Sequence, residues 1–317
     1  MPAPLTSNAT SSAPPAGQAR AVLYMMFGGL AATLGNVFLK IVAVDMHPFE
    51  ITFFRCFFSL FLLAPILFRH GLTPLKTNNF GMHVLRGGLQ SFGMIVSHWA
   101  FAIAPLAKIT ALSFSGPLFA TLLAALFLKE RIRMRRIAAL VIGFSGALII
   151  VRPGTMDFDL GSSLALAGSV EFGFTMLVIK LMTRTESALT LTFYLGIVST
   201  PITFAIAWFV WQTPSLEQLG WMLGVSACAT ISNFLTAQAV READMSVIMP
   251  IRFTRLIFAA LIGYLLFFEV PGIYTWIGGT MIFGASIYIA YRERKVKQSH
   301  PLPVTTTVKA KAYLPPV

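Results

Sequence analysis

Two arginines three residues apart lie inside one long apolar stretch, and they are the residues best suited to chemistry in this chain. Residues 245–269, MSVIMPIRFTRLIFAALIGYLLFFE, are long enough to cross a bilayer and carry Arg252 and Arg255 in their first half. Three residues apart on a helix, the two side chains form one basic face. A guanidinium binds carboxylate or phosphate through two parallel hydrogen bonds, so this face suits an anionic or zwitterionic solute. The alternative is that both arginines pair with internal carboxylates and only stabilise helix packing.

Two more charged side chains lie within apolar stretches. Glu171, in LAGSVEFGFTMLVIK, could bind a substrate amino group or exchange a proton during transport. It could equally be the counter-ion of one of the arginines at membrane depth, and the two roles are compatible. For Arg55, in FEITFFRCFFSLFLL, we favour a structural role, in which it reaches the headgroups or pairs with Glu50 or Asp45.

Uncharged polar and aromatic residues on helix faces could complete a cavity. Such residues also join helices by hydrogen bonds in membranes, so each has a packing alternative, above all the histidine. The candidates are Asn36, Gln90, His98, Trp99 and Asn233. The two cysteines and five histidines are scattered, so we expect no metal site, no cofactor and no catalytic residues.

Composition shows which elements must position these side chains. Hydrophobic residues make up 56% of the 317 residues and charged residues only 11%, which indicates an all-α polytopic membrane protein. Ten apolar segments have roughly the length of a membrane span. They cover approximately residues 21–40, 49–68, 84–104, 107–128, 135–152, 160–182, 189–211, 218–239, 246–268 and 273–291. Residues 1–19 and 296–317 are expected to be disordered tails.

The basic residues predict orientation. The net charge of +12 would suggest nucleic acid in a soluble chain, but here 18 of the 24 lysines and arginines fall on one side of the predicted spans. Positively charged loops stay in the cytoplasm, so both termini are expected there. We therefore expect the lipid bilayer, not nucleic acid, as the macromolecular environment.

An internal repeat appears when residues 100–130 are laid over 239–269. Phe114 then falls on Phe253, Ser115 on Thr254 and Glu130 on Glu269. Each half holds five spans, and an odd number inverts the second half, so the fold is predicted to be ten transmembrane helices in two inverted five-helix repeats, 20–152 and 153–295. Such repeats place substrate sites near the midplane between the halves. The same register sets Ser113 and Gly116 against the arginine pair, which suggests that span 4 supplies room and span 9 supplies charge.

The two halves resemble the drug/metabolite transporter superfamily, specifically its ten-span EamA-type members. The resemblance rests on AFAIAPLAKITALSFSGPLFATLLAALFLKE and LVIGFSGALIIVRPG in the first half, and on MPIRFTRLIFAALIGYLLFFE and WIGGTMIFGASIYIAYRE in the second. It implies a bacterial inner-membrane (plasma-membrane) carrier that moves a small metabolite through a central cavity by alternating access. Glu130 and Glu269, at the ends of matching spans, are interpreted as structural or interface residues. They follow Lys and Phe, where the family often has Gly.

These patterns favour a secondary transporter. The alternative is an intramembrane enzyme acting on a lipid-linked or small apolar substrate, but the chain has neither an H-E-x-x-H motif nor a P-loop. Span 1 carries no carboxylate, unlike what a multidrug cation exporter needs, so we expect a metabolite with a negative group. Amino acids, vitamins, organic acids and nucleotide-like molecules all fit, and no oligomeric state is predicted.

Overall fold

The described elements of the chain are helices. The computed structural model describes residues 15–70, 77, 79–127, 134–153, 159–182, 186, 188–242, 248 and 251–299. The helices are α1 (Pro15–Val42), α2 (Pro48–His70), α3 (Phe80–Ile103), α4 (Leu106–Ser113), α5 (Gly116–Phe127), α6 (Met134–Val151), α7 (Leu160–Met182), α8 (Ala188–Ala207), the short 3-10 helix η2 (Trp208–Val210), α9 (Leu216–Glu242), α11 (Thr254–Phe267) and α12 (Ile273–Ser299).

Every apolar segment predicted as a span contains a helix, so the all-helical polytopic fold is confirmed. Seven spans are long and apolar enough to cross a membrane by length and composition, with α4 and α5 counted as one, and α11 is a shorter apolar helix. The ends differ from the prediction by a few residues. Helix α1 begins at Pro15, inside the segment expected to be a tail, because proline suits the first turn of a helix and needs no hydrogen-bond partner there.

Spans 4 and 9 are broken at equivalent positions of the repeat. In span 4 the break separates α4 from α5, and the Ser115 hydroxyl donates to the Leu112 carbonyl at 2.7 Å. In span 9 the chain turns just before α11, and the Thr254 hydroxyl donates to the Ile251 carbonyl, also at 2.7 Å. Pro117 explains the first break, since its ring lacks an N–H and clashes with the carbonyl four residues before it. The matching caps support the alignment of the two repeats.

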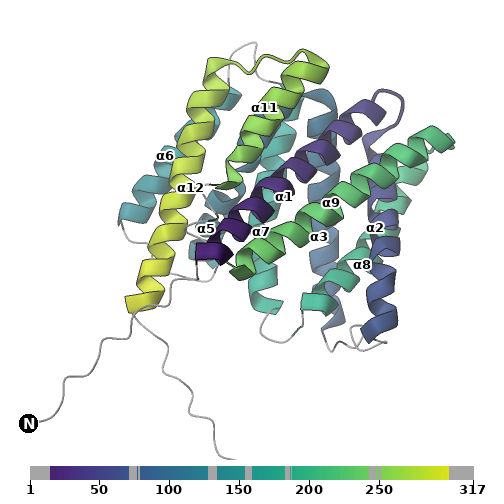
Figure 1. The fold of residues 1–317 in the computed structure, drawn as a ribbon, viewed down its shortest axis with the longest axis horizontal. Coiled ribbons are helices and arrows are strands. Elements are labelled where there is room, and N and C mark those ends of the chain that lie inside the picture. Colours follow the sequence, from purple (N-terminus) through teal and green to yellow (C-terminus); the bar gives the residue numbers. More distant parts are fainter. Residues whose placement is uncertain are drawn as a thin grey trace, which may run out of the picture.

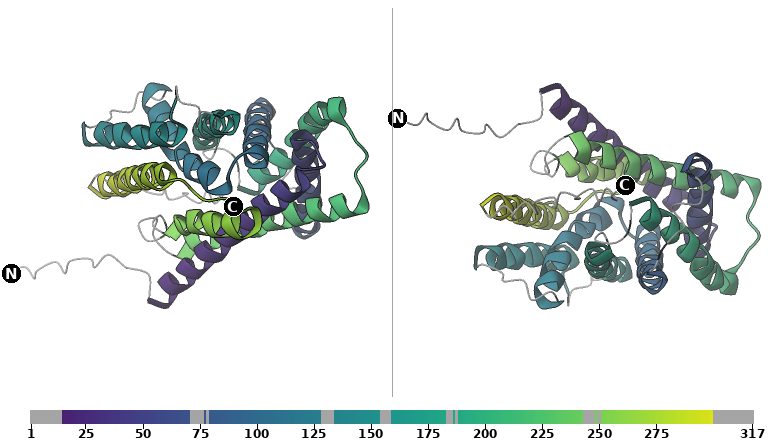
Figure 2. Two further views of the ribbon diagram at one scale, coloured as in Figure 1. Left: turned by 90° about the horizontal axis from the view of Figure 1, so that it is seen from above. Right: turned by 90° about the horizontal axis from the view of Figure 1, so that it is seen from below.

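The helices form two layers. Figure 1 shows α1 and α9 crossing the bundle side by side, and Figure 2 shows these two helices with α11 on one side of the molecule and α3, α5 and α7 on the other. Two pairs complete the bundle, α6 against α12 and α2 against α8. The polar residues of the sequence analysis are thereby divided between the layers.

The packing obeys the exchange symmetry of two repeats. Exchanging α1, α2, α3, α4–α5 and α6 with α7, α8, α9, α11 and α12 converts the most extensive contacts either into one another or into themselves. Thus α1 against α9 becomes α7 against α3, and α1 against α11 becomes α7 against α4–α5. Each layer therefore combines the first helix of one repeat with the third and fourth of the other, and a cavity within a layer is built from both halves.

One polar cluster ties three helices together at the end of the bundle where α11 finishes. The Glu269 carboxylate accepts a 2.8 Å hydrogen bond from the backbone N–H of Leu106 and forms an ion pair with Lys40. The Lys40 ammonium also donates to the Ala104 carbonyl at 2.8 Å. A carboxylate at the first turn of α4 satisfies an N–H that has no partner within its helix. Glu269 thus links α1 with α4 just after α11 ends.

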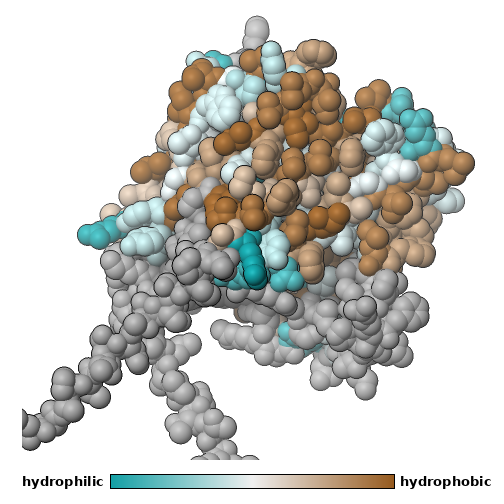
Figure 3. Space-filling model, in the orientation of Figure 1, coloured by the Kyte–Doolittle hydropathy of each residue, from teal (hydrophilic) through white to brown (hydrophobic). Residues whose placement is uncertain are grey.

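The outer surface is apolar over the middle of the bundle. Figure 3 shows that hydrophobic residues occupy most of the middle of the face seen in Figure 1, over the described part of the chain. Large side chains with more than half of their surface exposed include Phe27, Leu265 and Trp208. Contiguous apolar patches of this extent are rare on soluble monomers and suit contact with lipid chains.

Candidate functional site

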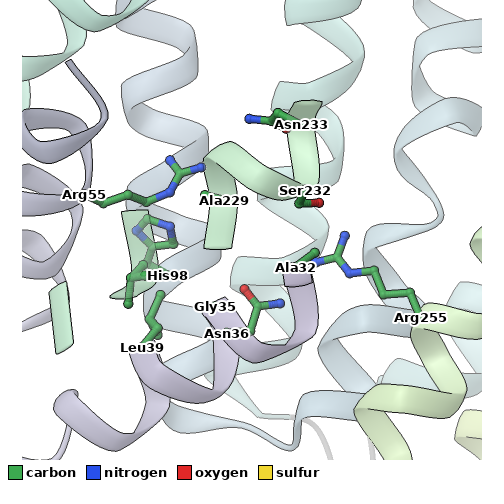
Figure 4. A pocket seen from close by; sticks show the side chains of 11 residues that line it. Ala32, Gly35, Asn36, Leu39, Arg55, His98, Ala229, Ser232, Asn233 and Arg255 are labelled. Carbon is green, nitrogen blue, oxygen red and sulfur yellow. The ribbon is translucent and has the colours of Figure 1, made fainter. Parts of the chain in front are cut away.

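A cavity of about 180 Å³ lies between α1, α2, α3, α9 and α11. Figure 4 shows Arg255 on one side of it, Arg55 and His98 on the other, and Asn36 between them. Its wall combines two guanidiniums with two amides, one hydroxyl and one imidazole, and it contains no carboxylate among the described residues. The lining residues are Ala32, Gly35, Asn36, Leu39, Arg55, His98, Val225, Ala229, Ser232, Asn233 and Arg255.

Small residues of α1 let this helix approach its neighbours closely beside the cavity. A Cβ atom on Gly29 would lie 3.6 Å from the Cβ of Arg255, and one on Gly35 would lie 3.2 Å from the Cβ of Cys228 on α9. The backbone of α1 therefore approaches both neighbours closely. The expectation that span 4 supplies room was wrong for this cavity, because no residue of span 4 lines it and a Cβ on Gly116 would lie only 2.8 Å from the Phe172 ring. The space beside that glycine is already filled.

Arg255 brings a positive charge to the cavity, and the described residues provide no ion-pair partner for it. Its Nε atom is buried and makes no hydrogen bond, and none of the ion pairs found in the described part of the chain involves it. It is the second residue of α11, where unpaired backbone N–H groups and the helix dipole add positive potential. A guanidinium in this position can bind an acidic group that enters the cavity.

Arg55 lies on the cavity wall rather than at the headgroups. It forms no ion pair with Glu50 or Asp45, which are also described, so the pairing that we expected is not observed. Its Nη1 atom contacts the Met94 sulfur at 2.6 Å, and its carbonyl accepts a 3.1 Å hydrogen bond from the Ser226 hydroxyl. The Glu50 carboxylate instead accepts a 2.6 Å hydrogen bond from the backbone N–H of Gln212, two residues after η2. Packing of α2 between α3 and α9 turns the arginine inward.

His98 reaches the cavity from α3 and is held from behind by α2. Its Nδ1 atom lies 2.8 Å from the Thr52 hydroxyl oxygen, which lies 2.7 Å from the Pro48 carbonyl oxygen. Of the other polar candidates, Asn36 and Asn233 also line the cavity. Three of the five uncharged candidates from the sequence therefore meet at one place.

Glu171 lies at the contact of α7 with α3, outside the lining of this cavity. Its Oε1 atom accepts a hydrogen bond from Thr175, and its Oε2 atom fills the space where a side chain on Gly93 would be. The side chain is 6% exposed and has no cation within ion-pair distance in the described residues. It is therefore not seen as the counter-ion of an arginine.

The remaining candidates are dispersed. Arg252 precedes the turn at Phe253 and is half-buried, and it is not among the residues that line the cavity. The interruption at Phe253 keeps helical backbone angles, φ −68° and ψ −21°, so the two arginines remain close together while only Arg255 lines the cavity. Gln90 is half-buried elsewhere on α3, and the Trp99 ring packs against other rings, 5.6 Å from that of Phe49. Glu130 lies outside the described residues.

Sequence reasoning missed residues of the cavity wall, such as Ser232, and also Thr52, which lies behind the wall against His98. Ser232 is adjacent to the candidate Asn233, and Thr52 lies three residues before Arg55 on the same face of α2. That spacing was a usable signal for Thr52, since residues three apart on a helix are neighbours. The glycine and alanines that only provide space carry no such signal.

Two consecutive five-helix units, each with a broken fourth span, surround this cavity, and the sequence matches a family with the same organisation. A model described as the EamA-like transporter family matches residues 19–152 and again 159–291. The chain belongs to the EamA-like transporter family. It is a multi-pass membrane protein and a transporter of small metabolites, and the intramembrane enzyme is set aside.

Relatives within this family have several named solutes. The chain is 32% identical over 266 residues to an S-adenosylmethionine uptake transporter of Rickettsia felis, covering 84% of this chain and 90% of the relative. It is 30% identical over 247 residues to a riboflavin transporter of Brucella anthropi, covering 75% and 86%. A solved crystal structure aligns over 88% of this chain and 99% of its own, with a TM-score of 0.59 at 15% identity, which shows the shared fold alone.

Proposed function

We propose that this EamA-family protein is a secondary transporter for an anionic or zwitterionic metabolite, whose acidic group binds Arg255 in the central cavity. The observation that carries the proposal is the arginine itself, which lines the cavity with a buried, unpartnered Nε atom. Arg55 adds a second positive charge, and no lining carboxylate in the described chain neutralises either. A buried charge without a partner is costly, so a negatively charged solute would stabilise the site.

Alternating access is supported by the size of the cavity and by the Lys40–Glu269 ion pair at the end of the bundle where α11 finishes. At about 180 Å³ the cavity is smaller than the usual range of roughly 300–1,000 Å³ for small-molecule sites, so it must widen to admit a metabolite. The Lys40–Glu269 pair holds α1 close to α4 on one side of it. Opening of the cavity toward that side requires Lys40 and Glu269 to separate. Because the two layers are related by exchange of the repeats, a corresponding motion of the other layer would open the cavity toward the opposite side.

Glu171 is proposed as a residue that takes up and releases a proton during transport. It is a buried carboxylate at the α3–α7 contact with a hydroxyl as its hydrogen-bond partner, and α3 also carries His98. A change of its charge would alter the contact between the two repeats. The proposal is tested by uptake into proteoliposomes at several external pH values, with Glu171→Gln beside wild type. A pH dependence that persists unchanged in the variant would leave Glu171 with a structural role only.

The bacterial inner membrane is proposed as the location, with both termini in the cytoplasm. Support comes from the basic residues on one side of the spans and from the bundle, in which the start of α1 and the end of α12 lie at the same end (Figure 1). Amino acids, vitamins, organic acids and nucleotide-like molecules remain the proposed solutes, and the named solutes of the relatives belong in any panel.

The proposal is tested by uptake assays with Arg255→Ala and Arg255→Lys. A panel of S-adenosylmethionine, riboflavin, amino acids and organic acids is offered to cells that produce each variant at equal membrane levels. We expect Arg255→Ala to lower uptake of the transported solute by at least about ten-fold. Arg255→Lys should recover part of the uptake, since lysine keeps the positive charge but cannot form the two parallel hydrogen bonds of a guanidinium. The matched control is Arg20→Ala, which removes an exposed arginine. Full uptake by Arg255→Ala would refute the proposal.

A further inference from the structure

The hydrogen bonds behind His98 determine which of its ring nitrogens holds the proton. The Thr52 hydroxyl has one hydrogen and two neighbours, the Pro48 carbonyl oxygen at 2.7 Å and His98 Nδ1 at 2.8 Å. A carbonyl oxygen only accepts, and two oxygens at 2.7 Å repel unless a hydrogen lies between them, so the hydroxyl hydrogen points to Pro48. The contact with the ring then needs a hydrogen on Nδ1.

The other nitrogen, Nε2, is consequently the acceptor that His98 offers to the cavity. It makes no hydrogen bond within the described part of the chain, while the residue lines the cavity beside Arg55. No lining carboxylate in that part of the chain favours a second proton on the ring. The arginines of the wall only donate hydrogen bonds, and its amides can turn either side toward a solute. The Nε2 atom differs from all of these because it is fixed as an acceptor.

We propose that His98 Nε2, held in this state by Thr52, accepts a hydrogen bond from the transported solute, so that the solutes of this cavity carry an N–H or O–H donor in addition to an acidic group. This inference rests on the proposed function, since it specifies the solute of the same cavity. It separates amino acids and hydroxy acids from acids that have acceptors alone. Thr52 acts as a positioning residue, because it is completely buried behind the ring and does not line the cavity.

Matched pairs of acids test the donor directly. The pairs are L-malate and succinate, L-glutamate and glutarate, and L-phenylalanine and 3-phenylpropanoate, in which only the first member has a donor on the carbon beside a carboxylate. Binding to the purified full-length protein is measured by thermal stabilisation over a concentration series. For any pair that binds to wild type, the donor-bearing acid is expected to bind about ten-fold more tightly, the typical effect of one hydrogen bond. Equal or tighter binding of the donor-lacking acid would overturn the proposal.

Three variants test whether the preference for donor-bearing acids depends on the relay, by which we mean the hydrogen bonds that link His98 Nδ1 through the Thr52 hydroxyl to the Pro48 carbonyl. Thr52→Val keeps the volume but frees the Nδ1 hydrogen from its acceptor, so the preference is expected to fall to about two-fold while overall binding persists. Thr52→Ser keeps the hydroxyl and should keep the preference. Thr200→Val is the matched control, since Thr200 also donates to a carbonyl four residues earlier, that of Gly196 at 2.7 Å, without touching a histidine. A full preference in Thr52→Val would overturn the role of Thr52.

A measurement without any solute tests the protonation state of His98 on which the inference depends, even if no pair of acids binds. Nitrogen-15 NMR of the histidine-labelled full chain, with the His98 signals assigned by their loss in His98→Gln, is expected to show a protonated Nδ1 and an unprotonated Nε2. A protonated Nε2 in the resting protein would overturn the inference. This result does not depend on Arg255, so a failure of the proposed function, seen as normal uptake by Arg255→Ala, remains distinguishable from a failure of the relay.

Discussion

Separating Lys40 from Glu269 should destabilise the protein by an amount that the geometry allows us to estimate. The two side chains are 15% and 14% exposed, so the pair is largely shielded from water. Glu269 also caps α4 through the Leu106 N–H at 2.8 Å. In Glu269→Gln the amide oxygen can still accept from that N–H, but the ammonium of Lys40 loses its negative partner. Because hydrogen bonds to charged groups contribute about 1.5–3 kcal/mol, we expect a loss of about 2 kcal/mol in the free energy of unfolding.

Lys40→Met should cost more, about 3 kcal/mol, because it leaves the carboxylate buried without a cation. The double variant should be more stable than the sum of the two losses predicts, with a coupling energy of about 1.5 kcal/mol. The assay is equilibrium unfolding in mixed micelles of dodecyl maltoside and dodecyl sulfate, followed by tryptophan fluorescence.

The matched control is Glu217→Gln, which alters an exposed glutamate at the start of α9 and should change stability by less than about 0.5 kcal/mol. Two outcomes would refute the reasoning. One is a Glu269→Gln variant as stable as the control. The other is a double variant whose loss equals the sum of the single losses, since the pair would then have no interaction energy.

Two further predictions concern packing and pH. Gly278→Ala should destabilise the bundle by about 1–3 kcal/mol, because the new methyl group would meet the backbone carbonyl of Gly146 where α12 crosses α6. Gly284→Ala in the same helix is the control, since its methyl group meets nothing within 4 Å and should be tolerated. Thermal unfolding of both variants checks this, and equal melting temperatures would contradict the close approach. Hydrogen bonding from Thr77 holds the pKa of Glu186 below its usual range against the opposing effect of burial, and Asn79 and His83 lower it further. The stability contributed by Glu186 should be present in full above the ordinary glutamate pKa of about 4.3 and be lost as the pH falls through the lower pKa of the folded state. The melting temperatures of wild type and Glu186→Gln should therefore converge in acid. A difference in melting temperature that stays constant at every pH would contradict this prediction.

The spans could be predicted from the sequence because the physics that defines them is local. Long apolar runs must form helices in a bilayer, so each predicted segment contains one. The repeat predicted the equivalence of Ser115 and Thr254, and both cap a break. A proline in an apolar run favours a kink, and the break in span 4 lies just before Pro117. Pro201, in contrast, lies inside the continuous helix α8, since neighbouring helices can accommodate a proline in a span.

The composition of the cavity was only partly predictable, because it depends on how each helix is rotated within the bundle. Arg55 looked like an interfacial residue from its place in the sequence, but the packing of α2 directs it to the cavity. Arg252 and Arg255 are three residues apart, yet only Arg255 lines the cavity, and their spacing does not specify which of the two does so. Glu171 and the arginines are far apart in sequence, and nothing local specifies that Glu171 lies against Gly93 instead.

The central claim is that Arg255 binds the acidic group of the solute, and binding of an acid and of its methyl ester tests it most directly. The acid that wild type takes up best in the panel is titrated, with its methyl ester, into purified wild type, Arg255→Ala and the control Arg20→Ala. Wild type and the control should prefer the acid by about 2 kcal/mol, roughly thirty-fold, and Arg255→Ala should bind acid and ester nearly alike. If Arg255→Ala keeps the full preference for the acid, the carboxylate binds elsewhere and the account is contradicted.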